Sequence, residues 1–305
     1  QELYAEYIAP VGNGLKIQAG KINTLIGYEG INSWENPNFS RSFMFGLSQA
    51  FTTTGIRFTY PLASWGTVAL GLVNGWDNIE DNNRGKTFEW KVDLTPHEKF
   101  GVAFFGSYGA EQSNGGNGGF FCTGAVGTAG CDSTSKRTVV GSIITIKPTE
   151  KDTLILEPYY GNESNASPLR AGLGQTPNAR WNGFIAYFTH DFNDQTQPHA
   201  LSLRVRGEIF EDAGGARTCT GGQNFNGGTN TCAGSPGGLF GTPAVYAGVR
   251  QTLTEGTFTL QYKPSPSLIT RAEFRYDSSN RDSFIRGDRA VDNQSTLGFS
   301  VVYLF

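Results

Sequence analysis

The stretch KTFEWKVDL, residues 86–94, decides the fold class. Apolar side chains occupy every second position, and polar or charged side chains occupy the positions between them. Because successive side chains of a strand point to opposite faces, this alternation is typical of a strand with one apolar face and one wet face. The stretches LITRAEFRYD, residues 268–277, and 201–208 repeat the pattern. Together they predict an all-β protein.

About thirteen segments of this kind follow one another, and most have about the 9–11 residues that a tilted membrane strand needs. They are 1–9, 15–23, 52–60, 66–76, 86–95, 99–109, 136–147, 153–161, 179–190, 199–211, 245–263, 267–277 and 294–305.

The connections between these segments alternate between short and long. The short ones are rich in proline, which starts turns and cannot donate to a ladder. They are PVGNG, PLASW, PHEK, PTEKD, NDQTQP and PSPS. The long ones are polar and cover 24–51, 77–85, 110–135, 162–178, 212–244 and 278–293. This puts all tight turns at one end of the sheet, as in outer-membrane barrels with short periplasmic turns and long external loops. A soluble sandwich does not usually sort its connections in this way.

The chain therefore predicts a single antiparallel up-and-down transmembrane β-barrel over residues 1–305, with no linker-like break. The first and last strands run in the same direction, whereas closure of an antiparallel barrel needs an even number of strands. We expect about 14 strands, so either one more strand precedes Gln1 or the segments above divide or omit one strand. This number of strands allows a narrow water-filled lumen. The last segment, STLGFSVVYLF, alternates and ends at Phe305, which is typical of the terminal strand of bacterial outer-membrane proteins.

Composition excludes several classes of protein. A net charge of −3 argues against a nucleic-acid partner. The four cysteines form two local pairs, Cys122 with Cys131 and Cys219 with Cys232, in segments rich in small polar residues. This favours two disulfide loops in an oxidising compartment, although three connectivities are formally possible. Their spacing lacks a CxxC form and has no histidine nearby, so we expect no metal and no cofactor.

Four motifs resemble the OmpL-like family of outer-membrane β-barrel porins. They are GLKIQAGKINTLIGYEGINS (residues 14–33), SRSFMFG (40–46), GLVNGWD (71–77) and YKPSPSLITRAEFRYD (262–277). Their order and spacing match along most of the chain. The resemblance implies a barrel in the bacterial outer membrane with a porin role.

If the apolar face of each strand meets lipid, the polar face lines the lumen. This predicts the pore-lining residues Lys16, Arg57, Glu89, Lys91, Asp93, Glu157, Arg204, Arg206, Glu208, Lys263, Arg271, Glu273, Arg275 and Asp277. The near balance of the two charges predicts weak ion selectivity. Two interpretations remain open, a lattice of salt bridges that holds the wall and a transverse field across a constriction. The arginines at 204, 206, 271 and 275 are the main candidates for that field.

The connection 24–51 is the leading candidate for a plug or constriction. It carries Tyr28, Trp34, Phe39, Phe43 and Phe45, and so aromatic a loop is costly to leave in water. An external Ω-loop or a helical cap at the rim is the alternative. For Trp65, Trp76, Trp90 and Trp181 we expect places in interfacial girdles.

We expect no enzyme activity, because His97, His190 and His199 all lie at short turns, away from any triad-like spacing. The favoured function is a porin for passive diffusion of small hydrophilic solutes or ions across the outer-membrane bilayer. The alternative is a structural or partner-binding barrel, with its lumen plugged or filled by a periplasmic or extracellular protein. A soluble β-sandwich adhesin or lectin is a third, weaker hypothesis.

Overall fold

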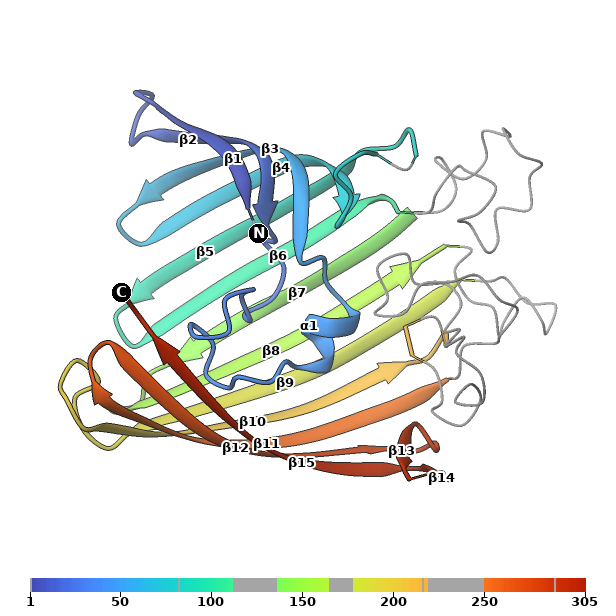
Figure 1. Cartoon of the computed structure of the whole chain (residues 1–305). Coiled ribbons are helices and arrows are strands. Elements are labelled where there is room, and N and C mark those ends of the chain that lie inside the picture. Colours follow the sequence, from blue (N-terminus) through green and yellow to red (C-terminus); the bar gives the residue numbers. More distant parts are fainter. Residues whose placement is uncertain are drawn as a thin grey trace.

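One curved antiparallel sheet dominates the computed structural model, which describes residues 2–81, 83–111, 136–164, 178–215, 217–218, 250–287 and 289–305. Thirteen strands pair in chain order within these residues (Figure 1). They are β1 (Leu3–Ala9), β2 (Leu15–Asn23), β3 (Thr52–Ala63), β4 (Gly66–Trp76), β5 (Thr87–His97), β6 (Phe100–Ala110), β7 (Lys136–Ile146), β8 (Asp152–Glu163), β9 (Ala179–Asp191), β10 (Ala200–Asp212), β11 (Gln251–Ser265), β12 (Leu268–Ser279) and β15 (Asn293–Tyr303). A small hairpin, β13 (Phe284–Arg286) and β14 (Arg289–Val291), lies in the last long connection.

The strands predicted from alternation are confirmed, with small shifts at their ends. The predicted strand 245–263 is described from Gln251 onward, and residues 245–249 lie outside the described part. Three strands run further than expected, through Pro61, Pro96 and Pro264. The register of each hairpin shifts at these places, which is how an antiparallel ladder accommodates a residue without an N–H donor.

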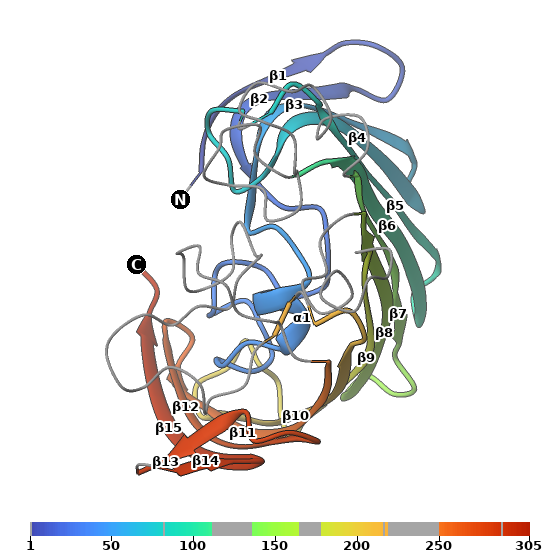
Figure 2. The same ribbon diagram turned by 90° about the vertical axis from the view of Figure 1, so that its right-hand side faces the viewer.

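The sheet curls into an incomplete barrel (Figure 2). Among the described strands, β1 pairs with β2 alone and β15 pairs with β12 alone, so these two strands form the edges. An odd number of antiparallel strands makes both edges run in the same direction, as the sequence predicts. The expected fourteenth strand stays a prediction.

The convex face of the sheet is apolar. Leu70, Phe104, Phe258, Phe299 and Val301 are exposed there, and Phe299 keeps 75% of its surface accessible. An outward apolar band is what a barrel wall in a lipid bilayer requires.

Among the described residues, no helix has the length and apolar character needed to cross a membrane.

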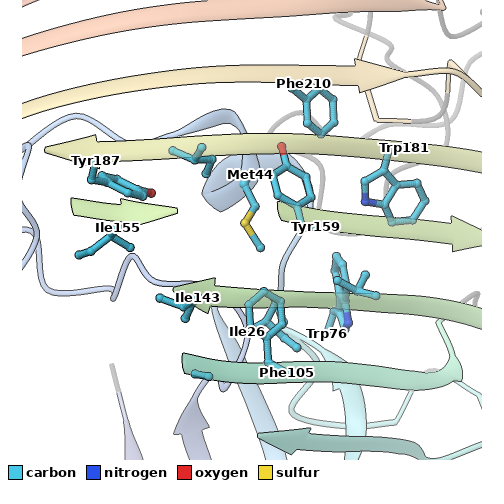
Figure 3. Close-up of a cluster of buried hydrophobic side chains, with 14 of the residues drawn as sticks. Ile26, Met44, Trp76, Phe105, Ile143, Ile155, Tyr159, Trp181, Tyr187 and Phe210 are labelled. Carbon is cyan, nitrogen blue, oxygen red and sulfur yellow. The ribbon is translucent and has the colours of Figure 1, made fainter. Parts of the chain in front are cut away.

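The concave face holds the connection 24–51, which we call the inner segment (residues 24–51). It contains the helix α1 (Phe43–Leu47) and lies inside the curve of the sheet (Figures 1 and 2). A cluster of buried apolar side chains joins it to the wall (Figure 3). The core of the molecule therefore lies within the barrel.

Candidate functional site

The inner segment starts and ends at one place on the wall. The amide of Thr24 donates to the carbonyl of Phe51 at 3.1 Å, which closes the loop. The amides of Phe51 and Thr52 both donate to Oδ1 of Asp77, at 3.0 and 2.9 Å. Asp77 directly follows β4 and has a φ of 59°. Its carboxylate therefore ties the end of the inner segment to the end of the hairpin formed by β3 and β4. The segment is thus a closed loop anchored at the end of the sheet where the long connections lie.

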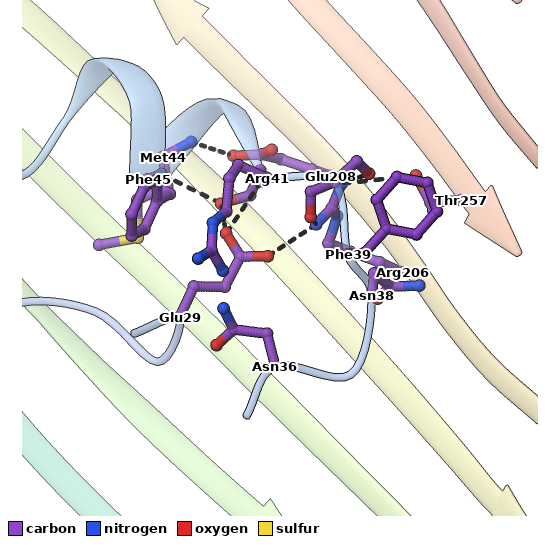
Figure 4. Close-up of polar contacts among 12 residues, drawn as sticks. Glu29, Asn36, Asn38, Phe39, Arg41, Met44, Phe45, Arg206, Glu208 and Thr257 are labelled. Atoms are coloured by element: carbon purple, nitrogen blue, oxygen red, sulfur yellow. Dashed lines mark hydrogen bonds and ion pairs between the residues drawn. The ribbon is translucent and has the colours of Figure 1, made fainter. Parts of the chain in front are cut away.

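The helix α1 is positioned by two buried carboxylates. Ser42 is its N-cap, and the hydroxyl of Ser42 accepts from the amide of Phe45 at 3.0 Å and donates to Oε2 of Glu29 at 2.7 Å. Glu208 on β10 accepts from the amides of Phe43 and Met44, at 2.5 and 2.8 Å (Figure 4). Unpaired amides and the positive end of the helix dipole both favour a negative charge at this position. The first turn of α1 is therefore fixed to the barrel wall.

Arg206 links the segment to the neighbouring strand (Figure 4). Its Nη1 lies 2.6 Å from Oε1 of Glu29, and its Nε lies 2.5 Å from Oε1 of Glu255 on β11. The same Nη1 donates to the carbonyl of Ser40 at 2.8 Å. All three charged side chains are buried. Each charge is hydrogen-bonded to a partner of opposite sign, as burial of a charge requires.

β12 binds the middle of the inner segment through its backbone. Glu273 accepts from the amides of Phe39 and Ser40, at 2.9 and 3.0 Å. Arg271 donates to the carbonyls of Ser33 and Trp34, both at 2.9 Å.

Further contacts of the same kind extend to three strands. Arg275 on β12 donates to the carbonyl of Arg41, and Glu157 on β8 accepts from the amide of Tyr28 at 3.0 Å. Asn38 donates to the hydroxyl of Thr259 on β11 at 2.7 Å. The side chains of the wall thus replace the water that an irregular backbone needs in order to satisfy its polar groups.

The opposite side of the segment is apolar. Ile26, Met44 and Ala50 are buried against inward side chains of β6 to β9 (Figure 3). These wall residues are Ala103, Phe105, Val139, Ile143, Ile155, Tyr159, Ile185 and Tyr187. The ring of Tyr28 packs on Tyr187 with centroids 5.0 Å apart. Complete burial of a side chain such as Met44 stabilises the packed segment by about 1.5–3 kcal/mol.

Three cavities border the inner segment within the described residues. A cavity of about 300 Å³ is lined by Phe39, Ser40 and Phe43 together with residues of β12 and β15. The other two lie on opposite sides of the segment. One of about 420 Å³ lies toward the long connections and is lined by Lys21, Ile31, Arg41, Phe45, Phe51, Thr52 and Asp77. The other, of about 280 Å³, lies toward the short turns and includes Tyr28, Lys91, Asp93, Glu98, Lys99 and Lys147 in its lining. Both of these cavities have polar and apolar walls, and residues of the segment contribute to each. The segment therefore narrows the interior between two wider spaces.

The model of a protein family described as "Putative beta-barrel porin-2, OmpL-like" matches residues 1–305. The chain belongs to this family. The resemblance seen in the sequence motifs is thereby confirmed, and membership of this porin family places the protein in the bacterial outer membrane.

Two solved structures of one outer-membrane protein share the fold of this porin-family barrel at low sequence identity. OmpT of Vibrio cholerae, expressed in the outer membrane, is 16% identical with a TM-score of 0.52, covering 96% of this chain and 77% of its own. The in-vitro folded OmpT of the same organism is 14% identical with a TM-score of 0.51, covering 95% and 76%. The NanC porin is 11% identical with a TM-score of 0.40, covering 83% and 93%. A comparison with curated proteins gave no match.

The residues predicted to line the pore of this porin-family barrel fall into three groups. Glu157, Arg206, Glu208, Arg271, Glu273 and Arg275 contact the inner segment directly. Others pair along the wall. Arg57 and Glu89 form a buried ion pair at 2.8 Å, Lys91 and Asp93 are 3.6 Å apart, and Asp277 lies 2.7 Å from Arg275.

The third group makes no ion pair within the described residues. Lys263 donates to the carbonyl of Gln195 at 3.1 Å, whereas Lys16 and Arg204 make no hydrogen bond to a described residue. Both side chains are partly buried. The lattice of salt bridges predicted from the sequence is thus present in part, and among the described residues the ion pair of Arg206 with Glu29 joins it to the inner segment. A pore-lining role for these residues stays a prediction. The disulfides predicted between Cys122 and Cys131 and between Cys219 and Cys232 lie outside the described residues.

The structure decides between the two interpretations of the inner segment. It lies inside the barrel, and the external Ω-loop and the rim cap are both wrong.

The girdle position predicted for Trp76 and Trp181 is also wrong, because both side chains are buried in the interior cluster. The guanidinium of Arg217 lies 5.3 Å from the ring of Trp76 and 4.8 Å from that of Trp181. The guanidinium of Arg137 also lies 4.4 Å from the ring of Trp76, so both rings face buried cations on the inner side of the wall. Trp65 is half exposed, in keeping with a place at the interface.

Sequence reasoning missed the apolar inward residues of β6 to β9. Their signal is present in SIITI, residues 142–146, and in LIL, residues 154–156, where both faces of the strand are apolar. A strand with two apolar faces needs a cover on each side, as strands of fully buried sheets do. Lipid covers one face, so the other face requires protein inside the barrel.

Proposed function

We propose that the protein is a porin with a narrow channel for passive diffusion of small hydrophilic solutes or ions, and that the inner segment is its fixed constriction. The observation that carries this proposal is the attachment of the segment to the wall on two sides, between the two cavities on its opposite sides. Membership of a porin family supports a channel, and the geometry supports a narrow one.

A fixed constriction follows from how the segment is held. Its backbone binds carboxylates or guanidinium groups on β8, β10 and β12, and Met44 is 1% exposed. Release would expose the apolar inner face of β6 to β9 to water and leave several buried charges without partners, and each such loss is costly. The segment therefore acts as part of the wall, and the channel is the space that it leaves. We expect no catalytic activity.

Single-channel conductance of the folded protein in a planar bilayer tests the proposal. We expect small, steady conductance steps from the wild type. A variant with residues 30–41 replaced by a short Gly-Ser linker should give clearly larger steps, because the middle of the constriction is gone. The matched control replaces residues 284–291, the small external hairpin, and should conduct like the wild type. Altered electrophoretic mobility on heating verifies that each variant has folded into a barrel.

The filled interior favours one alternative, a plugged barrel whose function is structural or partner-binding. It predicts no conductance from folded, inserted wild-type protein and open channels from the 30–41 variant. In that outcome the proposal of an open porin is wrong. A protein partner for the external connections would then be the subject to pursue.

A further inference from the structure

We infer that Arg204, Lys263 and Arg271 form a binding site for small carboxylate anions inside the barrel, at the short-turn side of the inner segment. This inference rests on the proposed channel for the access of the anion, but the binding itself does not depend on conduction. It names a ligand class that the family description does not give.

The three cations project from adjacent strands toward the same face. In the register of the sheet, Arg204 on β10 is opposite Thr259 on β11, and Arg271 on β12 is opposite Gln261 on β11. Lys263 is two residues beyond Gln261 on the same strand. Residues opposite one another share a face, and so do every second residues of one strand. The three positive groups therefore meet on the concave side, toward the short turns.

These cations have no carboxylate bound to them, unlike their neighbours. Arg204 makes no hydrogen bond to any residue that the structure describes, and its Nε is buried without a partner. Lys263 donates to the carbonyl of Gln195 at 3.1 Å. Arg271 donates to the neutral oxygens of Gln261, Ser33 and Trp34, each at 2.9 Å. By contrast, Arg206 and Arg275, two and four residues further along the same strands, are paired with Glu29, Glu255 and Asp277.

The surrounding charges leave this cluster positive. Arg204 repels both Lys263 and Arg271, and Arg41 of the inner segment also repels Arg271. Two carboxylates oppose them. Asp191 attracts Arg204 and Lys263, and Glu273 attracts Arg271.

Glu273 is already engaged by two amides and by the hydroxyl of Thr259. Asp191 is thus the carboxylate left to attract the cluster, and its Oδ1 is buried without a hydrogen-bond partner within the described residues. Partly buried like charges destabilise one another until an opposite charge arrives. An anion with two carboxylates would satisfy the orphaned guanidinium and its neighbours, because guanidinium groups match carboxylates in geometry and charge.

Lysines on or beside β5 to β7 also add positive charge at the short-turn end of the barrel. The cavity at the short-turn end is lined by Lys91, Lys99 and Lys147, against Asp93 and Glu98. The lumen residues that sequence reasoning found balanced are therefore unequal in effect. Glu157, Glu208 and Glu273 are engaged by the inner segment, whereas Nε of Arg204 has no hydrogen-bond partner among the described residues.

Titration calorimetry with succinate, on the folded barrel in detergent, tests the site without needing a channel. We expect succinate to bind the wild type, and the double variant Arg204→Gln with Arg271→Gln to weaken binding by at least about tenfold. The matched control is Lys151→Gln, which removes one positive charge from an exposed turn at the same end. Inorganic phosphate serves as a second probe, and it should bind more weakly than the dicarboxylate. Equal succinate binding by the wild type and the double variant, or none by either, would overturn the inference.

Ion selectivity provides a second readout. With a potassium chloride gradient across the bilayer, the reversal potential of the wild type should show a several-fold preference for chloride. The preference should fall toward unity in Arg204→Gln and stay unchanged in Lys151→Gln. The variant Arg204→Lys keeps the charge and should keep most of the preference. Conducting channels that prefer potassium would contradict the anion site while leaving the porin proposal intact. Absent conductance with intact succinate binding would contradict the porin proposal alone.

Discussion

Two sectors of the inner wall hold the same segment by different means. β6 to β9 meet it with apolar side chains such as Phe105, Ile143 and Ile185, which are almost completely buried. β10 to β12 meet it with charged groups that bind its backbone, Glu208 at the start of α1 and Glu273 at the preceding turn.

The difference teaches how a loop can be a permanent part of a pore. Apolar contact supplies most of the free energy that holds the segment in place, but the hydrophobic effect does not depend on the direction of the contact. Hydrogen bonds to buried charges fix position, because a buried charge without its partner is costly. The apolar sector therefore retains the segment, and the polar sector fixes its position.

The largest expected effect comes from the apolar sector. The substitution Met44→Ala should lower the free energy of unfolding by about 2–5 kcal/mol, because it leaves a cavity in a fully packed site. Denaturant unfolding of the folded protein measures this, followed by tryptophan fluorescence. Ile79→Ala, on an exposed connection, is the control and should change stability little. A small effect of Met44→Ala would show that the apolar contact does not hold the segment.

Glu208→Ala should come next, with a loss of about 1–3 kcal/mol. It leaves the amides of Phe43 and Met44 and the hydroxyl of Tyr159 without their acceptor. Glu208→Gln keeps acceptor oxygens and should lose less. Fluctuations of the open-channel current should increase in Glu208→Ala more than in Met44→Ala if the polar sector fixes position. Equally steady currents in both variants would remove that distinction.

The N-cap of α1 should give a smaller effect. Ser42→Ala removes the acceptor for the amide of Phe45 and one donor to Glu29, for a loss of about 0.5–2 kcal/mol. The same unfolding measurement detects it, and Ser42→Asn should restore much of the loss. A loss as large as that of Met44→Ala would mean that the helix, rather than the apolar cluster, determines the stability of the segment.

The smallest effect should come from a partly exposed ion pair on the lumen wall. Lys91→Gln breaks an ion pair with Asp93 that is partly exposed, and such pairs contribute about 0.2–1 kcal/mol or less. We expect nearly unchanged unfolding and a modest reduction of chloride preference. An unfolding change above that of Ser42→Ala would show that this wall also depends on its charges.

The sequence predicted the strands because alternation is a local property. In residues 86–94 and 268–277, the alternation of a few neighbouring side chains indicates which face of the strand is apolar. The length of each connection indicates at which end of the barrel that connection lies. The terminal run to Phe305 follows the same rule. None of these inferences needs knowledge of a distant part of the chain.

The course of the inner segment is different. Glu29 and Arg206 are separated by 177 residues, and Phe39 and Glu273 by 234, yet each pair is in direct contact. Periodicity says that Arg206 and Glu273 face inward but not what they meet there. The same limit applies to Trp76 and Trp181. Their positions at strand ends are compatible with an interfacial girdle, and the sequence does not show that the guanidinium of Arg217 lies beside both rings.

The sequence by itself determined the wall of this protein: its strands, their direction, its apolar outside and the charged part of its inside. Only the tertiary structure decided which segment lies inside that wall, and which charged side chains remain without an oppositely charged partner there. The physical reason is that a strand's two faces are written into its own residues, whereas pairing of charges depends on which side chains closure of the barrel brings together. Arg204 and Arg206 are two positions apart on one face of β10. Their surroundings alone make Arg206 a structural group and leave Arg204 free to bind a solute.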